Sequence, residues 1–376
     1  MQIIIVGAGI LGASTAFHLA ASGAAVTIVD AGLDGRATAA GAGIICPWVS
    51  GAEDAAFMRL YTGGGEYYPE LVAALADAGE TDTGHRRAGA MLVAAEPPEL
   101  AWLERMARSR HVPAMGAVTR LPPEQARQAF PPLRHDLGGV HIEGGARVDG
   151  RRITAALLRA AERLGARRRD GDARPVVTAG RVAGVSIDGT PLPADIVILT
   201  AGAWGDAVLR GIGGHLPVEP QRGQIVHLQL PDSGTEDWPV ILPPGSHYIV
   251  PFDDGRIVAG ATRETGAGFD YRVTAAGQHE VLTEALHIAP GLGEATLIET
   301  RIGFRPATTG IRPMLGWVPN IEGLVLGNGL GAAGLTIGPL AGRLLADLVL
   351  GRDPAIDLAP FGLAVRREAG AAVALR

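Results

Sequence analysis

The chain has 376 residues, of which 47% are hydrophobic, and its formal net charge is −6 at pH 7. This composition allows one large or two medium soluble domains, and the acidic balance gives no indication of the concentrated basic face that nucleic-acid binding requires. All 33 basic residues are arginine, which excludes a Gly-Lys-Ser/Thr phosphate loop and a pyridoxal phosphate Schiff base. Cys46 is the only cysteine and the histidines show no metal-ligand spacing, so we expect neither internal disulfides nor a metal site.

The apolar N-terminus does not fit a signal peptide. It has no positively charged start, and glycines together with Ser14, Thr15 and His18 interrupt its apolar stretch. Elsewhere no unbroken apolar run reaches the roughly 20 residues that a transmembrane helix needs. The sequence therefore predicts a cytoplasmic protein without a transmembrane segment, and it leaves open a peripheral contact at the inner face of a membrane.

The first thirty residues predict a nucleotide site. A β-branched run at 3–6 is followed by Gly7, Gly9 and Gly12, then by a predicted helix at 13–21 and a second strand that ends in Asp30. In this strand-turn-helix context the glycines allow a tight turn, a close approach of pyrophosphate and helix-strand packing, while the acid accepts hydrogen bonds from a ribose. Asp30 disfavours a ribose 2′-phosphate and hence NADP, but the motif alone does not separate NAD from FAD.

Further predicted elements follow in chain order. Residues 36–48 form a loop of small residues, 52–79 are helical, and 88–137 contain proline-punctuated turns and helices. The remaining predictions before the tail are an amphipathic helix at 151–164, strands at 176–177, 182–187 and 194–200, antiparallel strands within 224–262, a helix at 276–289 and a strand at 299–304.

The C-terminal segment has the same predicted order as the N-terminal one: a strand, a glycine-rich turn and a helix. Pro339 suits the first position of that helix, which we expect to begin near Gly338, and Gly351 suits the residue just past its end. Two nucleotide-type segments, one at each end of the chain, are therefore expected to enclose a β-rich insertion.

Several segments together resemble the FAD-dependent amino acid oxidase superfamily, which includes glycine oxidase, sarcosine oxidase and D-amino acid dehydrogenase. They are "IIIVGAGILGAS", "ATAAGAGI", "VDGRRITAALLRAAERLGA", "ADIVILTAGAWG", "PQRGQIVHL", "HYIVPFDDGRIVAGAT", "RIGFRP" and "GNGLGAAGLTIGP". The resemblance implies an α/β protein, with a Rossmann-like FAD-binding domain of the glutathione-reductase type and an interleaved antiparallel-sheet substrate domain. The expected FAD-binding domain covers 1–80, 138–215 and 307–376, and the substrate domain covers 81–137 and 216–306.

The resemblance also assigns the cofactor and its site. FAD is expected to be held non-covalently, because no cysteine lies in the second half of the chain, where relatives with covalent flavin carry one. The implied cofactor-binding residues are Gly7, Gly9, Ile10, Leu11, Gly12, Asp30, Ala31, Thr38, Gly41, Ala42, Gly43, Ile44, Val176, Ala201, Gly202, Trp204, Gly327, Gly329, Gly331, Gly334, Leu335 and Thr336.

Two residues match the substrate site of the family. Tyr248 aligns with a tyrosine that touches substrate, and Arg305 aligns with the arginine that binds its carboxylate, for which a guanidinium is a bidentate partner. The alternatives are a packed sheet tyrosine for Tyr248 and an ion pair with Glu299 for Arg305. Weaker pocket candidates are Trp48, His247 and Asn328.

The expected reaction is hydride transfer from the α-carbon of a small amino acid, favoured as a D-amino acid, to flavin N5, leaving an imino acid. The open alternatives are a secondary-amine oxidase or dehydrogenase of the type that acts on sarcosine, hydroxyproline or the primary amine glycine, a 2-hydroxy acid dehydrogenase, and a flavoprotein without catalysis. The electron acceptor is oxygen or a quinone-type compound. A homo-oligomer is compatible with the sequence.

Overall fold

The computed structural model describes residues 1–231 and 234–363. Its first strand lies inside a six-stranded sheet. The strand order is β18-β19-β12-β1-β2-β8, and every neighbouring pair is parallel except β18 and β19. The strands are β1 (Gln2–Val6), β2 (Ala25–Asp30), β8 (Arg167–Asp170), β12 (Ile196–Leu199), β18 (Met314–Trp317) and β19 (Leu324–Asn328). Ile3 to Val6 are buried, as expected for a central parallel strand covered on both faces.

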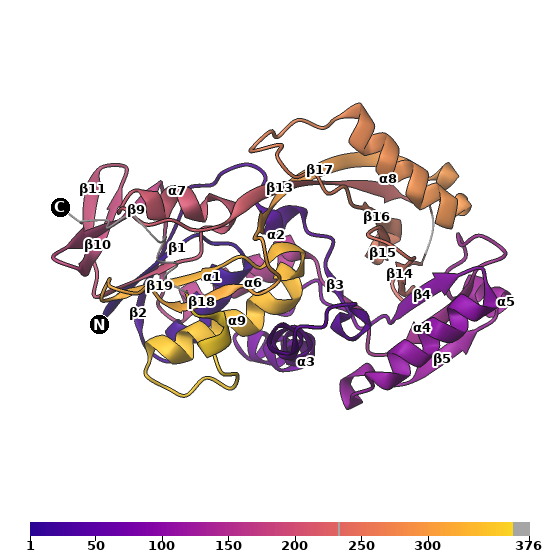
Figure 1. Cartoon of the computed structure of the whole chain (residues 1–376), viewed down its shortest axis with the longest axis horizontal. Coiled ribbons are helices and arrows are strands. Elements are labelled where there is room, and N and C mark those ends of the chain that lie inside the picture. The colour runs from indigo at the N-terminus through magenta and orange to yellow at the C-terminus, as the bar shows by residue number, and fades with distance from the viewer. Residues whose placement is uncertain (232–233, 364–376) are drawn as a thin grey trace, which may run out of the picture.

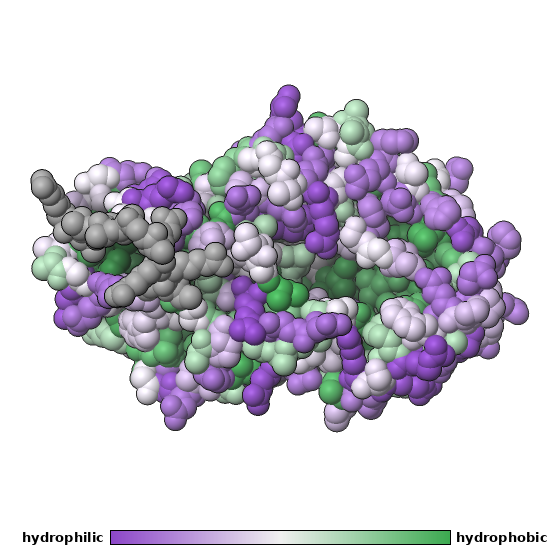
Figure 2. All heavy atoms as spheres, in the orientation of Figure 1, coloured by the Kyte–Doolittle hydropathy of each residue, from purple (hydrophilic) through white to green (hydrophobic). Residues whose placement is uncertain are grey.

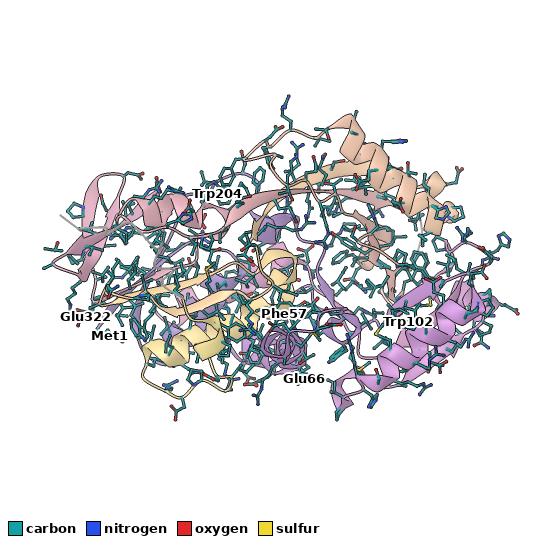
Figure 3. The ribbon with its side chains drawn as sticks, viewed as in Figure 1. Met1, Phe57, Glu66, Trp102, Trp204 and Glu322 are labelled. Carbon is teal, nitrogen blue, oxygen red and sulfur yellow. The ribbon has the colours of Figure 1, made fainter. Side chains whose placement is uncertain are left out.

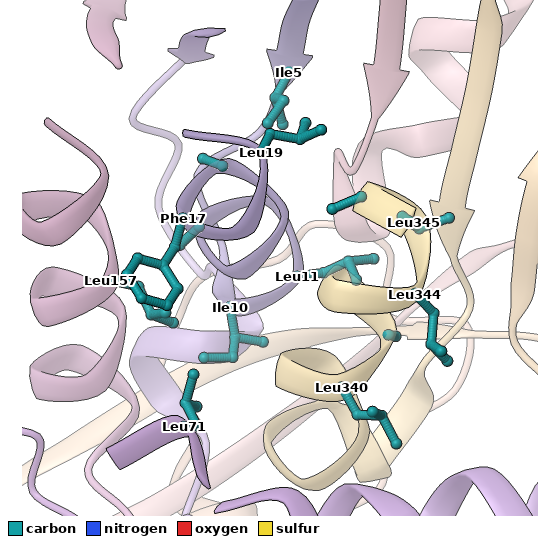
Figure 4. Close-up of a cluster of buried hydrophobic side chains, with 14 of the residues drawn as sticks. Ile5, Ile10, Leu11, Phe17, Leu19, Leu71, Leu157, Leu340, Leu344 and Leu345 are labelled. Atoms are coloured by element: carbon teal, nitrogen blue, oxygen red, sulfur yellow. The ribbon is translucent and has the colours of Figure 1, made fainter. Parts of the chain in front are cut away.

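The helix that follows β1 lies at the centre of the largest apolar core. Figure 4 shows Phe17 against Leu157 on one side, and Leu11 beside Leu344 and Leu345 on the other. The helices of this layer are α1 (Ile10–Ala21), α3 (Ala55–Asp77), α6 (Gly150–Arg163) and α9 (Gly334–Val349). The last helix of the chain therefore packs on the first.

An eight-stranded sheet forms the other half of the molecule, at the right in Figure 1. Its order is β17-β13-β16-β15-β14-β4-β6-β5, antiparallel except for the parallel pair β14 and β4. The strands are β4 (Ala90–Ala94), β5 (Val118–Leu121), β6 (Gly138–Ile142), β13 (Glu219–Gln229), β14 (Val240–Leu242), β15 (Tyr248–Pro251), β16 (Arg256–Gly260) and β17 (Thr296–Ala307). Its helices are α4 (Pro97–Ser109), α5 (Pro123–Ala129) and α8 (Ala275–Ile288).

Several shorter elements complete the fold. They are α2 (Ala37–Ala40), β3 (Ile44–Ile45), β7 (Ala146–Arg147), α7 (Gly205–Arg210), and the small antiparallel sheet of β9 (Ala173–Thr178), β10 (Arg181–Ile187) and β11 (Thr190–Pro193). The mixed α/β class, with a largely parallel Rossmann-like sheet and a largely antiparallel second sheet, is confirmed.

The predicted domain boundaries and the structure assign β6 to different domains. The boundary at residue 138 assigns β6 to the FAD part, whereas β6 pairs with β4 and β5 in the eight-stranded sheet. We therefore propose that the second segment of the FAD-binding domain begins after Ile142. The predicted last segment extends to residue 376, and its portion 364–376 lies outside the described residues.

The predicted start of the last helix is wrong. The helix begins at Gly334, so Pro339 lies inside it, where it cannot donate a hydrogen bond to the carbonyl of Leu335. The buried hydroxyl of Tyr68, on α3, donates to that carbonyl oxygen at 2.6 Å and replaces the missing bond. A tertiary contact thus allows a proline that local rules place at the helix start. Gly351 follows the helix with φ +69, as predicted.

Residues 331–349 are long and apolar enough to cross a membrane, but two thirds of that stretch is buried inside the protein. The contacts of α9 with α1 and α3 account for its composition. We therefore interpret this stretch as a core helix.

Candidate active site

A cavity of about 940 Å³ runs between the two sheets. The ends of β1, β2, β12 and β19 open into it, at the carboxyl edge of the parallel strands, where open α/β sheets bind their ligands. The other sheet contributes residues of β13, β15 and β17. On the face drawn in Figure 2 the molecule is hollowed between the segments that carry α8 and α4, and apolar residues lie in the hollow.

Each of the three glycines in the first turn is required for a different structural reason. Gly7 has φ +106, and a β-carbon there would lie 2.5 Å from the Thr200 carbonyl oxygen. A β-carbon on Gly12 would overlap the Gly7 carbonyl, so this glycine allows the helix to meet the strand. Gly9 lines the cavity, and a β-carbon there would meet only the Thr38 hydroxyl, at 3.3 Å. The space beside Gly9 is thus kept open toward the cavity.

Asp30 lies at the end of β2, on the cavity wall. One carboxylate oxygen accepts from the Ala8 amide at 2.6 Å, and the other accepts from the Gly32 amide at 2.8 Å and from Arg36 at 3.2 Å. These bonds connect the acid to the turn around the glycines. A carboxylate oxygen can accept more than one hydrogen bond, so Asp30 retains capacity for a ribose hydroxyl.

Most of the residues predicted to hold the cofactor line this one cavity. They are Gly7, Gly9, Ile10, Leu11, Asp30, Ala31, Thr38, Gly41, Ala42, Gly43, Ile44, Ala201, Gly202, Trp204, Gly327, Gly331, Gly334, Leu335 and Thr336. Figure 3 labels Trp204, which lies near the start of β13.

Three predicted cofactor residues lie off the cavity wall. Gly12 lies where the helix packs against the Gly7 carbonyl. Gly329 has φ +74, and its neighbours are Thr308 and Met314. Val176 is solvent-exposed on β9, and residues earlier in the same strand, Ala173 and Arg174, line the cavity instead. The predicted contact of Val176 is made by its backbone, so the exposed side chain does not contradict it, and the contact stays a prediction.

Tyr248 and Arg305 both line the cavity, although two strands separate them in the sheet. The two intervening strands, β13 and β16, carry a glycine at the point where the side chains of Arg305 and Tyr248 cross them. A β-carbon on Gly223 of β13 would lie 2.6 Å from Arg305 Nη1, and one on Gly260 of β16 would lie 2.8 Å from the Tyr248 hydroxyl. The two glycines leave the room in which the guanidinium and the phenol converge.

The guanidinium of Arg305 is available to a ligand. Its Nη1 donates to the Thr262 carbonyl at 3.0 Å, while Glu299, the alternative partner, pairs with Arg301 at 2.5 Å. Burial lowers the pKa of Arg305 and raises that of Tyr248, and each group partly offsets the shift of the other. Tyr248 therefore stays a neutral hydroxyl beside a cation, able to donate a hydrogen bond.

A second arginine at the cavity escaped the sequence analysis. Arg263 is exposed, lines the same cavity, and lies near enough to shift the pKa values of Tyr248 and Arg305. Within residues 1–231 and 234–363, neither Arg263 nor Arg305 forms an ion pair with an acid. The only sequence signal was its position just after "VAGAT", at the end of a predicted strand.

Two of the three weaker pocket candidates line the cavity. His247 lines the cavity, with Nε2 3.4 Å from a Glu280 oxygen. Asn328 also lines it, but its amide donates to the Gly202 carbonyl at 2.9 Å and its oxygen accepts from the Gly329 amide, which fits a role in shaping the turn. Trp48 is buried and does not reach the cavity wall. Among the described residues no group of His, Cys, Asp and Glu could hold a metal ion.

Comparison with known proteins identifies the family. The sequence model of the DAO family, described as FAD dependent oxidoreductase, matches residues 2–348. The chain belongs to the DAO family. It is therefore an FAD-dependent oxidoreductase that acts on amine C–N bonds, and FAD is its cofactor.

Individual relatives of this DAO-family chain cover nearly its whole length. The crystal structure of iminodiacetate oxidase from Chelativorans sp. BNC1 superposes with a TM-score of 0.93, at 50% identity, over 96% of this chain and 98% of that one. The oxidoreductase YurR of Bacillus subtilis, whose activity is uncharacterized, is 48% identical over 95% of this chain and 97% of its own length. Glycine oxidase of Pseudomonas putida is 32% identical, over 96% and 97%.

The residues of the cavity fit FAD. The space beside Gly9 is open for a pyrophosphate, and Asp30 keeps acceptor capacity at the far end of β2. Gly327 and the turn before α9 lie on the wall shared with the second sheet. The start of α9 directs backbone amides and a partial positive charge to this part of the cavity, which favours bound negative charge.

Gly223→Ala is expected to displace Arg305 without unfolding the protein. The new methyl group would overlap a flexible guanidinium rather than backbone, and Gly223 does not need a positive φ. We expect kcat/KM to fall about tenfold or more, because the guanidinium predicted to bind the substrate carboxylate is moved. FAD content should stay at the wild-type level. Gly310→Ala, at a position open to solvent, is the matched control. Normal kinetics in Gly223→Ala would show that Arg305 tolerates the shift.

Proposed function

We propose that this DAO-family enzyme oxidises the Cα–N bond of a small secondary amine that carries a carboxylate. The observation that carries the proposal is the cluster of Tyr248, Arg263 and Arg305 on one cavity wall. Two guanidinium groups without acid partners among the described residues, next to a hydroxyl donor, form a site for a carboxylate. FAD, when bound, accepts the hydride that leaves the α-carbon.

The site near Tyr248 favours an uncharged amine over an ammonium, and apolar wall residues suit the nitrogen substituent of a secondary amine. The acids among the residues lining the cavity are Asp30, Asp172 and Asp188. All three lie near the end of β2: the Gly171 amide donates to the Asp30 carbonyl, and Asp172 and Asp188 are hydrogen-bonded to each other. In the described part of the chain, no acid lines the cavity wall around Tyr248, so an ammonium would have no charge partner there. A nitrogen substituent would meet apolar wall residues: Val49, Leu92, Leu242 and Pro243.

The comparisons support the same substrate class. The relative at 50% identity is an iminodiacetate oxidase, and iminodiacetate is a secondary amine with a carboxylate on both arms. Glycine oxidase, at lower identity, shares the requirement for an amine and a carboxylate. D-Amino acids, favoured by the sequence analysis, meet the same carboxylate site and are the second candidate.

Anaerobic reduction of the flavin tests the proposal. Purified protein should be yellow, and acid precipitation should release FAD into the supernatant. We expect N-carboxymethyl amines such as iminodiacetate and sarcosine to bleach the flavin faster than D-amino acids, L-amino acids or 2-hydroxy acids. Reduction by D-alanine alone would replace the proposed class by the second candidate, and reduction by a hydroxy acid alone would overturn both.

The electron acceptor is tested in the same preparation. Oxygen uptake during turnover, compared with reduction of a soluble quinone at equal substrate concentration, separates an oxidase from a dehydrogenase. Oxygen and quinone-type compounds are the two acceptors proposed.

A further inference from the structure

We propose that Arg222 sequesters the carboxylate of Glu264, and that this keeps the carboxylate-binding arginines Arg263 and Arg305 unpaired. The inference rests on the proposed function, because it concerns the charge of the substrate site. Arg222 does not line the cavity, so it acts as a positioning residue through Glu264.

Arg222 and Glu264 are joined by main chain and side chain. Arg222 lies on β13, only 6% exposed, and its amide and carbonyl pair with the carbonyl and amide of Glu264. Its Nε and Nη2 donate to Glu264 Oε2 at 3.1 and 2.5 Å. Its Nη1 lies 2.8 Å from a carboxylate oxygen of Asp270, in the loop before α8. One buried guanidinium therefore holds two acids of the same loop.

The other oxygen of Glu264 is also occupied. Oε1 accepts from Gln224 Nε2 and from the Thr262 hydroxyl, each at 2.7 Å. Burial opposes ionisation of Glu264, but hydrogen bonds from Arg222, Gln224 and Thr262 overcome it and lower the pKa of this carboxyl. Glu264 is therefore a negative charge at neutral pH, and a definite set of donors keeps it directed away from the cavity.

The sequestered acid lies next to the residues that need to stay unpaired. Glu264 directly follows Arg263, and Thr262, which donates to Glu264 through its hydroxyl, accepts the bond from Arg305 through its carbonyl. Without Arg222, the partly buried carboxylate would lack its main counter-charge, and a charge left in this state seeks another partner. The adjacent cations are those assigned to the substrate carboxylate, so substrate would compete with Glu264 for them.

The loop is held at a second point, which keeps the test interpretable. Phe269 stacks on Trp204 with ring centroids 4.9 Å apart and packs edge-on against Phe304. Asp270 keeps a partner in Arg272, at 2.8 Å. Replacing Arg222 therefore removes the counter-charge of Glu264 while other contacts still attach the loop.

The experiment compares Arg222→Met, Glu264→Gln and the double variant in the FAD-loaded enzyme. The readout is the Kd of methoxyacetate, a carboxylate that is not turned over, measured by its perturbation of the flavin spectrum, together with KM and kcat. We expect Arg222→Met to raise this Kd and KM by about tenfold or more, with a much smaller change in kcat. The double variant, which lacks the freed charge, should return to within about threefold of wild type.

Controls separate a charge effect from a folding defect. Arg343→Met removes an arginine from an ion pair with Glu70, between α9 and α3, and should leave the Kd unchanged. Where Arg222→Met fails to retain FAD, Arg222→Lys with and without Glu264→Gln repeats the test, with a weaker effect rescued in the same way.

The outcomes distinguish this inference from the proposed function. A wild-type Kd in Arg222→Met, or a double variant as weak as the single one, overturns the role of Arg222. Wild-type enzyme that binds no carboxylate at all overturns the substrate site itself. Rescue by Glu264→Gln supports the inference even where the preferred amine differs, because methoxyacetate binding does not depend on turnover.

Discussion

Arg305→Ala is expected to lower kcat/KM for the best amine substrate about a hundredfold, which corresponds to about 3 kcal/mol of transition-state binding. Arg305 is the mostly buried member of the arginine pair, and its guanidinium lies beside the Tyr248 hydroxyl over Gly223. Removing it takes away the group that we propose orients the substrate carboxylate, and orientation is what hydride transfer requires. Stopped-flow reduction of the flavin under anaerobic conditions measures the loss directly.

Two further variants make this result specific. Arg305→Lys should recover little activity, because an ammonium cannot reproduce the planar pair of donors. Arg301→Ala is the matched control, since Arg301 lies on the same strand and its partner is Glu299. FAD content and Tm should change little in all three. An Arg305→Ala enzyme with near wild-type efficiency would make this arginine a structural residue.

Gly9→Val should produce a folded protein that has lost its FAD. The backbone at Gly9, with φ −69, accepts a valine, and the added β-carbon has only the Thr38 hydroxyl nearby. The branched side chain would occupy the space where the pyrophosphate approaches the turn. We expect FAD binding at least about tenfold weaker, since even one lost hydrogen bond to a charged group has an effect of that size. Equilibrium dialysis and the ratio of flavin to protein absorbance provide the measurement.

The neighbouring glycine provides the contrast. A side chain on Gly12 would overlap the Gly7 carbonyl, so Gly12→Ala is expected to lower Tm as well as FAD content. Full flavin occupancy in Gly9→Val would count against pyrophosphate binding at this turn.

Local features could be predicted well from the sequence. The buried strand 3–6, the glycine turn and the acid at the end of the second strand lie within thirty residues, and each element restricts its neighbours. The same is true of the amphipathic helix that the structure places at Gly150–Arg163. In these segments periodicity and capping determine the structure with little help from distant residues.

Features that depend on distant partners were missed. Pro339 is tolerated inside α9 because Tyr68 of α3 satisfies the freed carbonyl, and no local pattern contains that information. Arg263 enters the site because it follows β16, which lies between β13 and β15 in the sheet, and Gly223 matters because Arg305 crosses over it. Both facts are properties of strand pairing, which the sequence analysis did not predict in register.

The order of strands in the six-stranded sheet also bears on how the enzyme is made in the cell. β1 is synthesised well before its neighbour β12, and β19 and α9 follow later still. α9 packs on α1, where the Ser14 hydroxyl donates to the Pro339 carbonyl at 2.6 Å. A nascent chain that stops before α9 therefore exposes an apolar face of α1 and lacks the wall from Gly327 to Thr336. We therefore expect flavin loading to wait for the synthesis of α9, because a fragment carrying only the N-terminal glycine turn would lack much of the cavity wall.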